Sequence, residues 1–360
     1  MLLQSALWQT APKRTDFSDS ELNEIMRLAE KHALTALIFD VINENNINMN
    51  CDMAISYFAR CQQTKAMNTS VIEDLQKLTG FLDKRNIKYV VFKGQTVAAL
   101  YPKPLLRACG DIDFYVAQKS QNELKEQVSS RFSIEEDSVK HLGFRSNKAD
   151  YEMHYITAVF NYPPHQKYWN KIVEKDVDSG DTTISVMGKD VRIFSPTVNA
   201  VYLFIHIYHH LLKEGIGLRQ FCDWALFLKS NKEKIDKEQL CKILDKLGYK
   251  KAYRTLGCIL TEKLGLPAEY FPFELSAKDY KRSKSIWERI CNDGNFGKGL
   301  RKIQKAGWLR SLETAKVSFS HFLPLINLTP LEVLLFLPSE SYRSIMKNIY
   351  RIQGKQKKEE

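Results

Sequence analysis

Short runs rich in apolar and β-branched residues alternate with helical segments between residues 87 and 194, and this alternation narrows the choice of fold most. Such a run predicts a strand, whereas apolar residues at helical spacing predict a helix. The expected order is strand 87–92, helix 95–101, strand 111–116, helix 120–131, strand 151–160 and a hairpin over 182–194 that turns at Gly188-Lys189. This order predicts an α+β core of roughly 120 residues.

Helical periodicity dominates the chain on both sides of this core. Ser18 and Glu21 form the pattern of a capping box, and another helix is expected over residues 71–85. After the core, Ser195-Pro196 predicts the start of a buried helix, because the residues that follow are apolar on nearly every side. The expected units are an N-terminal helical segment over 1–70, the α+β core over 71–195 and a mostly helical C-terminal domain over 196–360.

The strongest chemical signal is Asp111-Ile112-Asp113, on the second expected strand. Residues i and i+2 of a strand share a face, so the two carboxylates stand side by side while Ile112 points into the core. Adjacent carboxylates repel each other unless cations neutralise them. Mg²⁺ prefers oxygen ligands, and two such ions can support phosphoryl transfer. The pattern therefore predicts a metal site, although it also occurs by chance in strands without one.

Lys93-Gly94 follows the first expected strand and opens a helix. Backbone N–H groups at a helix N-terminus can cradle a phosphate, and glycine allows its close approach. The same pair is also common in plain turns. The interval from Gly94 to Asp111 leaves room for one short helix and a return, so we expect both residues at the same end of neighbouring strands.

These motifs carry a family resemblance. The residues Phe92-Lys93-Gly94, Leu100-Tyr101-Pro102, Arg107 and Gly110-Asp111-Ile112-Asp113 resemble the signature of the nucleotidyltransferase superfamily, which includes DNA polymerase beta and CCA-adding enzymes. More narrowly, they resemble a bacterial group of uncharacterised nucleotidyltransferases. In the superfamily a glycine turn with a second small residue precedes the carboxylate pair. Here the turn is Gly94-Gln95, so glutamine replaces that small residue.

The resemblance implies a nucleotidyltransferase-like mixed sheet with flanking helices. It also implies that the chain moves a nucleoside monophosphate from a nucleoside triphosphate, expected to be ATP, to an acceptor hydroxyl with release of pyrophosphate. Two Mg²⁺ ions would bind to Asp111, Asp113 and a third carboxylate. The acceptor can be a small molecule, a protein or RNA. Lys93, Gly94, Gln95 and Arg107 would contact phosphate, although Arg107 can equally form a structural salt bridge.

Glu152 is the expected third carboxylate, on the strand over residues 151–160. Glu152-Met153-His154 resembles a Glu-x-His pattern of the narrower group at this place. Glu152 would act as a metal ligand or as the base for the incoming hydroxyl. His154 would bind phosphate, take the proton or orient Glu152. A cross-strand surface pair is the alternative.

The helical half contributes further candidates. His206, His209 and His210 lie on one expected helix, and His210, Arg219 and Asp223 resemble positions of the narrower group that face the nucleotide. Arg219 and Asp223 can instead form a plain helical ion pair at i,i+4. Histidines at this spacing can bind zinc, but no accompanying glutamate or cysteine pair supports that. A glycine-rich loop over residues 292–297 also resembles the group.

Charge and cysteine content bear on partners and location. The chain carries a net charge of +11, of which +9 lies in residues 281–360, so nucleic acid is weakly favoured as a partner. Seven scattered cysteines predict free thiols. No apolar run of membrane-spanning length and no signal-peptide pattern are found in the sequence, so we expect a cytoplasmic protein without disulfides or membrane contact.

Two other classes of function remain open at this stage. A non-catalytic module could use the same pocket to bind a nucleotide, or its basic C-terminal quarter to bind RNA. Such a module would need no third carboxylate. A scaffold protein is the third alternative, and it predicts that Asp111 and Asp113 are exposed to solvent with no cleft around them.

Overall fold

The computed structural model describes residues 1–146, 149–213, 215–294 and 325–341. Its strands are β1 Tyr89–Val91, β2 Asp111–Val116, β3 Ile134–Asp137, β4 His141–Arg145, β5 Asp150–His154, β6 Thr183–Val186 and β7 Lys189–Arg192. The first five form a mixed sheet in the order β1-β2-β5-β4-β3, and β6 and β7 form a separate hairpin. Within the five-stranded sheet, β2 and β5 are parallel, and the other neighbouring strands are antiparallel.

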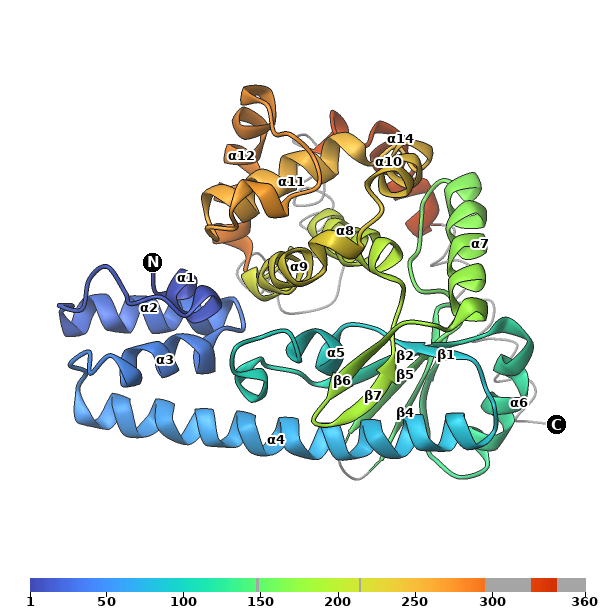
Figure 1. The fold of residues 1–360 in the computed structure, drawn as a ribbon, viewed down its shortest axis with the longest axis horizontal. Coiled ribbons are helices and arrows are strands. Elements are labelled where there is room, and N and C mark those ends of the chain that lie inside the picture. Colours follow the sequence, from blue (N-terminus) through green and yellow to red (C-terminus); the bar gives the residue numbers. More distant parts are fainter. Residues whose placement is uncertain (147–148, 214, 295–324, 342–360) are drawn as a thin grey trace.

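Helices pack around this sheet and extend away from it (Figure 1). They are α1 Leu2–Trp8, α2 Asp19–Lys31, α3 Thr35–Glu44, α4 Cys51–Lys84, α5 Gly94–Ala98, α6 Gln118–Ser129, α7 Pro163–Ser179, α8 Pro196–Lys213, α9 Leu218–Asn231, α10 Lys237–Lys246, α11 Lys250–Glu262, α12 Ala277–Asp293 and α14 Pro330–Leu334, with 3₁₀ turns η1 Pro104–Leu106, η2 Lys232–Lys234 and η3 Ala268–Tyr270. No helix of the described ranges has both the length and the apolar character needed to cross a membrane. The expected α+β fold with a mixed sheet and flanking helices is confirmed.

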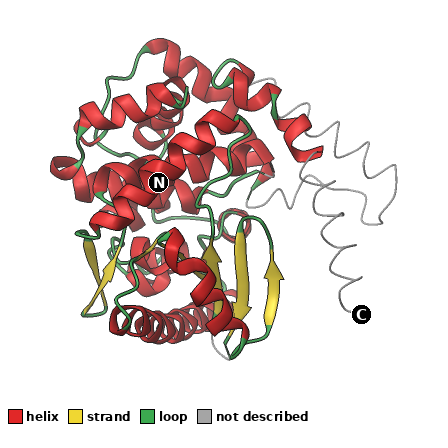
Figure 2. Ribbon diagram, turned by 90° about the vertical axis from the view of Figure 1, so that its right-hand side faces the viewer, coloured by secondary structure: helices red, strands yellow, loops and turns green. Residues whose placement is uncertain are grey.

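The two faces of the sheet belong to two different hydrophobic cores. Phe114 and Met153 point to one face, where they pack with residues of α4 and α6. Phe92 and Tyr115 point to the other face, which packs with α8 and the helices that follow. Because side chains alternate along a strand, Asp111, Asp113, Glu152 and His154 share the second face with Tyr115. Figure 2 shows the helical half of the chain above the strands on this side.

Helix α4 is much longer than expected. It runs through 34 residues without interruption, so the expected start at residue 71 is wrong. Asn50 begins the helix by accepting hydrogen bonds from the backbone N–H groups of Asp52 and Met53. The first half of α4 is mostly exposed and shows no apolar stripe, which is why helical periodicity did not reveal it. The expected boundary at residue 70 falls inside this helix, so the division into three units stays a proposal.

Several other elements differ from the sequence-based expectation. The strand expected over 151–160 ends at His154, and β3, β4 and α7 were not expected. Strand β3 is an exposed edge with three charged residues, so it lacks the alternation that predicts a strand. The hairpin is confirmed, but it turns at Met187-Gly188, since Val186 pairs with Lys189. Residues 295–297 of the glycine-rich loop and most of the basic quarter lie outside the described residues.

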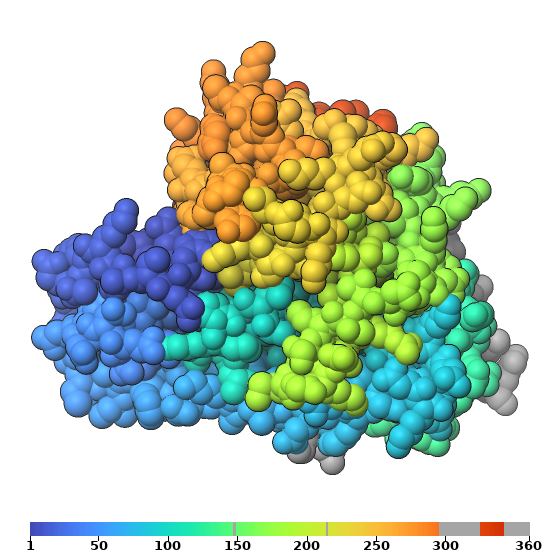
Figure 3. Space-filling model, viewed as in Figure 1, coloured from blue at the N-terminus to red at the C-terminus, as the bar shows by residue number. Residues whose placement is uncertain are grey.

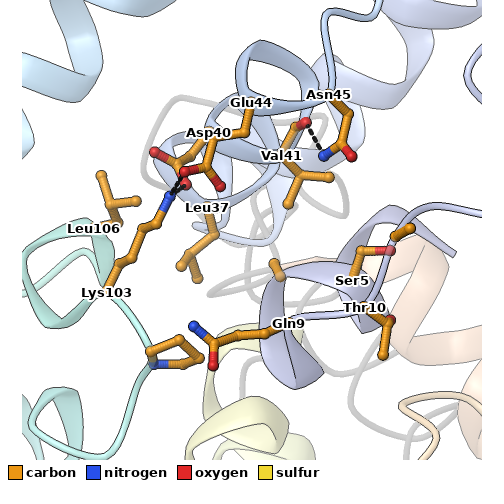
Figure 4. Close-up of a pocket in the computed structure, with 13 residues that line it drawn as sticks. Ser5, Gln9, Thr10, Leu37, Asp40, Val41, Glu44, Asn45, Lys103 and Leu106 are labelled. Atoms are coloured by element: carbon orange, nitrogen blue, oxygen red, sulfur yellow. Dashed lines mark hydrogen bonds and ion pairs between the residues drawn. The ribbon is translucent and has the colours of Figure 1, made fainter.

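The N-terminal helices lie against the rest of the chain (Figure 3), and their contacts include two polar ones. At one, Trp8 Nε1 of α1 donates a hydrogen bond of 2.6 Å to the carbonyl of Leu264, after α11. At the other, Lys103 forms ion pairs with Asp40 and Glu44 of α3, at the edge of a cavity of about 370 Å³ (Figure 4). The contact of Lys103 connects α3 to the loop that leads into β2.

Candidate active site

Two parallel strands bring three polar side chains together. The register of β2 and β5 pairs Asp113 with Glu152, and Tyr115 with His154. Asp113, Glu152 and His154 each offer one atom that can bind a metal, and these atoms lie within 4.8 Å of one another. His154 Nε2 donates a hydrogen bond of 2.7 Å to Oδ1 of Asp113 and lies 3.3 Å from Oε2 of Glu152. The alternation of β5 therefore places Glu152 and His154 beside the second carboxylate of the Asp-x-Asp pair.

Lys93 is the cation of this cluster. Its Nζ lies 2.8 Å from Oδ1 of Asp113, and its side chain is largely buried. Burial opposes the charged form of Lys93, but attraction to Asp113 outweighs it and raises the pKa of the ammonium. Burial likewise opposes the charge of Asp113, yet Lys93 and His154 together lower the pKa of that carboxyl. The two groups are therefore held as a buried ion pair at neutral pH.

Asp111 begins β2 and is half-buried on the same face as Asp113. The charge of Asp113, followed by burial, raises the pKa of Asp111. This shift is the signature of two carboxylates that repel each other in a confined space. Oxygen donors of Asp111, Asp113 and Glu152 on one face suit a hard divalent cation, which would relieve that repulsion. The residues present thus fit the metal expected from the sequence.

Gly94 approaches the start of β2 very closely. Its φ is +49°, and a Cβ at this position would lie 3.3 Å from the backbone oxygen of Asp111. Lys93, just before it, also has a positive φ of 63°, which is uncommon for a residue with a side chain. Such strain persists only where the surrounding structure fixes it, and it is typical of functional turns. The turn therefore fixes the positions of Lys93 and of the backbone of Asp111.

Other cationic and titratable groups surround the cluster. Lys140, in the turn between β3 and β4, is half-buried, and burial followed by the charge of Lys93 lowers its pKa. From α8, His206 and His210 lie with ring centroids 4.5 Å apart. Burial and then Lys93 lower the pKa of both, to about 3 for His210. Burial raises the pKa of the Tyr202 hydroxyl on α8, and the charges of Lys93 and Asp113 act on the same hydroxyl. Helix α8 therefore covers the carboxylates with neutral imidazoles.

His209 takes a different direction from its two neighbours. Its Nε2 is 3.1 Å from the hydroxyl of Tyr249, and its ring packs against Phe160. These contacts belong to the core between α7, α8 and α11, away from the carboxylates. Of the three histidines on α8, the structure brings His206 and His210 toward the site.

Arg107 forms a salt bridge with Asp223. Its Nε and Nη2 donate hydrogen bonds of 2.8 and 2.6 Å to the two carboxylate oxygens, and Tyr101 donates a third of 2.6 Å. Both charged side chains are about 95% buried. Of the two roles considered for Arg107, the structure shows the salt bridge, and a contact of either residue with the nucleotide stays a prediction. The pair joins the loop before β2 to α9.

Arg219 does not pair with Asp223 in the manner of a simple helical ion pair. Its Nη1 donates a hydrogen bond of 2.6 Å to the carbonyl of Ala108, and its Nε has no hydrogen-bond partner among the described residues. Burial, and then the nearby charge of Arg107, lowers the pKa of Arg219. Arg219 thus combines a buried positive charge with an unused donor.

Gln95 is held by structural contacts. Its Nε2 donates a hydrogen bond of 3.2 Å to Oδ1 of Asn68 on α4. Asn68 in turn donates to the carbonyls of Leu105 and Arg107. The residue that replaces a small one in the glycine turn therefore connects the turn, through Asn68, to the loop before β2, and its contact with phosphate stays a prediction.

Comparison with known proteins was informative at the level of the family. A family described as "Uncharacterised nucleotidyltransferase" matches residues 18–265. Among solved structures, the chain is similar to an antigenic nucleotidyltransferase-like protein from Paracoccidioides brasiliensis, with a TM-score of 0.35 and 16% sequence identity over 60% of this chain and 96% of that chain. No curated protein matches the sequence.

Proposed function

This chain belongs to the uncharacterised nucleotidyltransferase family, and from this premise we propose that it catalyses Mg²⁺-dependent transfer of a nucleoside monophosphate from a nucleoside triphosphate, with ATP as the first substrate to test. The family expected from the sequence motifs is thereby confirmed. The observation that carries the proposed activity is the parallel pairing of Asp113 with Glu152, which gathers acidic side chains beside Asp111 on one face of the sheet.

Asp111, Asp113 and Glu152 would hold the metal ions. When bound, Mg²⁺ supplies charge neutralisation to the phosphates and to the leaving pyrophosphate. Within the chain, His154 would orient the carboxylates by donating Nε2–H to Asp113 and by its proximity to Glu152. We assign His154 this positioning role, because the hydrogen bond to Asp113 already uses Nε2.

The proposed reaction joins an acceptor oxygen to the α-phosphorus. The bond between the α-phosphorus and the bridging oxygen breaks, and pyrophosphate leaves with that oxygen. Glu152 is the proposed base for the acceptor proton, since 30% of its side chain is accessible against 2% for Asp113. Most of the rate gain in such a reaction comes from positioning and charge stabilisation.

Three cations are proposed to contact the triphosphate. Lys93 lies at the carboxylates and precedes the glycine turn, and Lys140 and Arg219 lie in neighbouring elements. Lys140 was not expected from the sequence, because it lies in a turn and carries no motif. Because the imidazoles of His206 and His210 are neutral, they would not compete with these three cations for the phosphates. Gly94 would allow a phosphate to approach the backbone.

One experiment tests the activity without knowing the acceptor. The protein is incubated with Mg²⁺, a cell extract and each of the four NTPs labelled at the α-phosphate, and the extract is fractionated for labelled RNA, protein and metabolites. The proposed function predicts label in one fraction with wild-type protein and none with Asp113→Asn. Equal labelling by both proteins would refute the mechanism.

A non-catalytic nucleotide-binding module is the second candidate. The buried pair between Lys93 and Asp113 favours it, because this pair neutralises one proposed metal ligand without any metal. Gln95, bound to Asn68 in place of a small residue, favours it too. Titration of ATP and Mg²⁺ by calorimetry, followed by an assay for pyrophosphate, separates the two functions, because the module predicts binding without release. The acceptor and a cytoplasmic location remain proposals.

A further inference from the structure

A cavity of about 510 Å³ lies behind the strands of the candidate active site. It is lined by residues of α4, of α6 and of the face of the sheet opposite to the carboxylates, and it is open to solvent on one side. Phe114, which lines it, directly follows Asp113, and Tyr151, which also lines it, directly precedes Glu152. Because successive residues of a strand point to opposite faces, the cavity and the carboxylate cluster are separated by the sheet. A ligand in the cavity would therefore occupy a site of its own.

Five of the residues that line the cavity are aromatic, namely Phe81, Phe114, Phe132, Phe144 and Tyr151. Phe144 stacks on Tyr151, with ring centroids 5.0 Å apart and an angle of 2° between the planes. Its ring also contacts Phe132 at 5.4 Å and Phe114 at 6.5 Å. Phe132 is 39% exposed, so this aromatic group continues to the surface. The volume lies in the range of small-molecule sites, and the rings offer flat surfaces for a planar apolar ligand.

The charged groups around the cavity determine which ligand charge is favoured there. Asp74 is buried and already accepts hydrogen bonds from Ser146 Oγ at 2.6 Å and from Lys77 Nζ at 3.1 Å. Lys77 is otherwise exposed and retains two N–H donors. Arg131 lines the same cavity and is exposed, with no side-chain partner in the part of the chain that the structure describes. The unused charge at the cavity is therefore positive.

We propose that this cavity binds a small organic monoanion with a flat apolar body, of the class of aromatic carboxylates. The apolar body lies among Phe114, Phe132, Phe144 and Tyr151, and the carboxylate pairs with Arg131 and Lys77. Such a ligand buries apolar surface and gains charge-assisted hydrogen bonds at one end. This site does not depend on the proposed nucleotidyl transfer, because it uses none of the residues of the carboxylate cluster.

Isothermal titration with 2-naphthoate tests the charge and the shape of the ligand together. We expect one molecule of 2-naphthoate to bind per chain, and the uncharged 2-naphthamide to bind with an affinity at least about fivefold lower. Arg131→Gln is expected to reduce the affinity for the carboxylate about fivefold and to leave that for the amide unchanged. Lys119→Gln removes from the start of α6 a cation that does not line the cavity, and serves as the matched control. Equal affinity of wild type for both compounds, or no binding of either, would overturn the proposal.

A second variant tests the cavity itself. Leu78→Trp places a large ring in the cavity from α4 and is expected to abolish binding of 2-naphthoate. Circular dichroism and a thermal melt verify that this variant is folded. If it is not, the titrations of Arg131→Gln alone test the site. Asp113→Asn, once the same measurements show that it is folded, is expected to bind 2-naphthoate as wild type does. A loss of binding in Asp113→Asn, or its retention in folded Leu78→Trp, would place the compound elsewhere and refute the site.

Discussion

Lys93 Nζ lies 2.8 Å from Oδ1 of Asp113, so the chain supplies a cation to the carboxylate that the proposed function assigns to a metal. Both side chains are largely buried, and each one's charge is stabilised by the other. A buried ion pair contributes little compared with apolar packing, but removal of one partner leaves an uncompensated charge. The pair therefore makes metal binding and stability depend on each other, and this dependence can be measured.

Lys93→Met is expected to destabilise the protein by about 3 kcal/mol in the absence of divalent cations, because Asp113 loses its main counter-charge. Mg²⁺ or Mn²⁺ should restore more stability to this variant than to wild type, since the cation replaces the missing ammonium. Thermal melts with and without 10 mM metal, roughly a saturating concentration, measure this difference. Lys88→Met, which removes an exposed ion pair with Asp178, is the control. An equal metal effect in all three proteins would contradict the proposed metal site.

Asp111→Asn is expected to separate stability from activity. Because Asp113 and burial raise the pKa of Asp111, removing its charge relieves repulsion, and the variant should be as stable as wild type or slightly more stable. Nucleotidyl transfer should nevertheless fall roughly 100-fold or more, since a metal ligand is lost. Urea unfolding and the labelling assay measure the two effects. A destabilised variant that keeps its activity would show that Asp111 has a structural role.

The sheet was only partly predictable from the sequence. Strand β2 combines apolar Ile112, Phe114 and Val116 with the polar residues of the site, and this alternation identifies it. Strand β3 pairs only at the edge of the sheet and is mostly exposed, so its charged residues carry no such pattern. The pairing order β1-β2-β5-β4-β3 depends on contacts between distant segments, which local periodicity does not contain.

The candidate site was likewise only partly predictable from the sequence. Alternation predicted that Asp111 and Asp113 share one face of their strand and that Glu152 and His154 share one face of theirs. The pairing of β2 with β5 places these two pairs side by side. The partner of Arg107 could not be predicted, because Asp223 lies 116 residues away and carries no local signal for that contact. The same holds for Lys140. Their contributions follow from tertiary packing, whereas the functional roles of the four residues remain to be tested.

Arg107→Met is expected to destabilise the protein by about 3–5 kcal/mol, because it leaves the carboxylate of Asp223 buried and unpaired. Asp223→Leu should have a similar effect through the unpaired guanidinium. The double variant should lose much less than the sum of the two, since no buried charge remains. Urea unfolding of the four proteins gives the coupling energy. Additive effects would show that the salt bridge is not the main interaction of either residue.

His32 predicts a pH dependence of stability. It is 4% exposed at the end of α2, and burial, followed by Lys31, lowers its pKa to about 4. Since the unfolded chain binds a proton near pH 6.5, stability should fall as the pH decreases from about 6.5 toward 4, by about 2 kcal/mol at pH 5. His32→Leu removes this contribution. The difference in the free energy of unfolding between wild type and variant, measured by urea unfolding, should therefore decrease by that amount between pH 8 and pH 5. A difference independent of pH would mean that His32 is accessible to protons in the folded state.

Gly94→Ala and Gly188→Ala form a matched pair that tests the glycine turn. Both glycines have positive φ values, +49° and +81°, so alanine costs about 1–2 kcal/mol of stability at either position. At Gly188 the added Cβ meets nothing within 4 Å, whereas at Gly94 it lies 3.3 Å from the backbone oxygen of Asp111. We therefore expect similar losses of stability in urea but a loss of metal affinity and nucleotidyl transfer in Gly94→Ala alone, because only that variant displaces Asp111. If the two variants retain the same activity, close contact between the turn and β2 is not required for the proposed reaction.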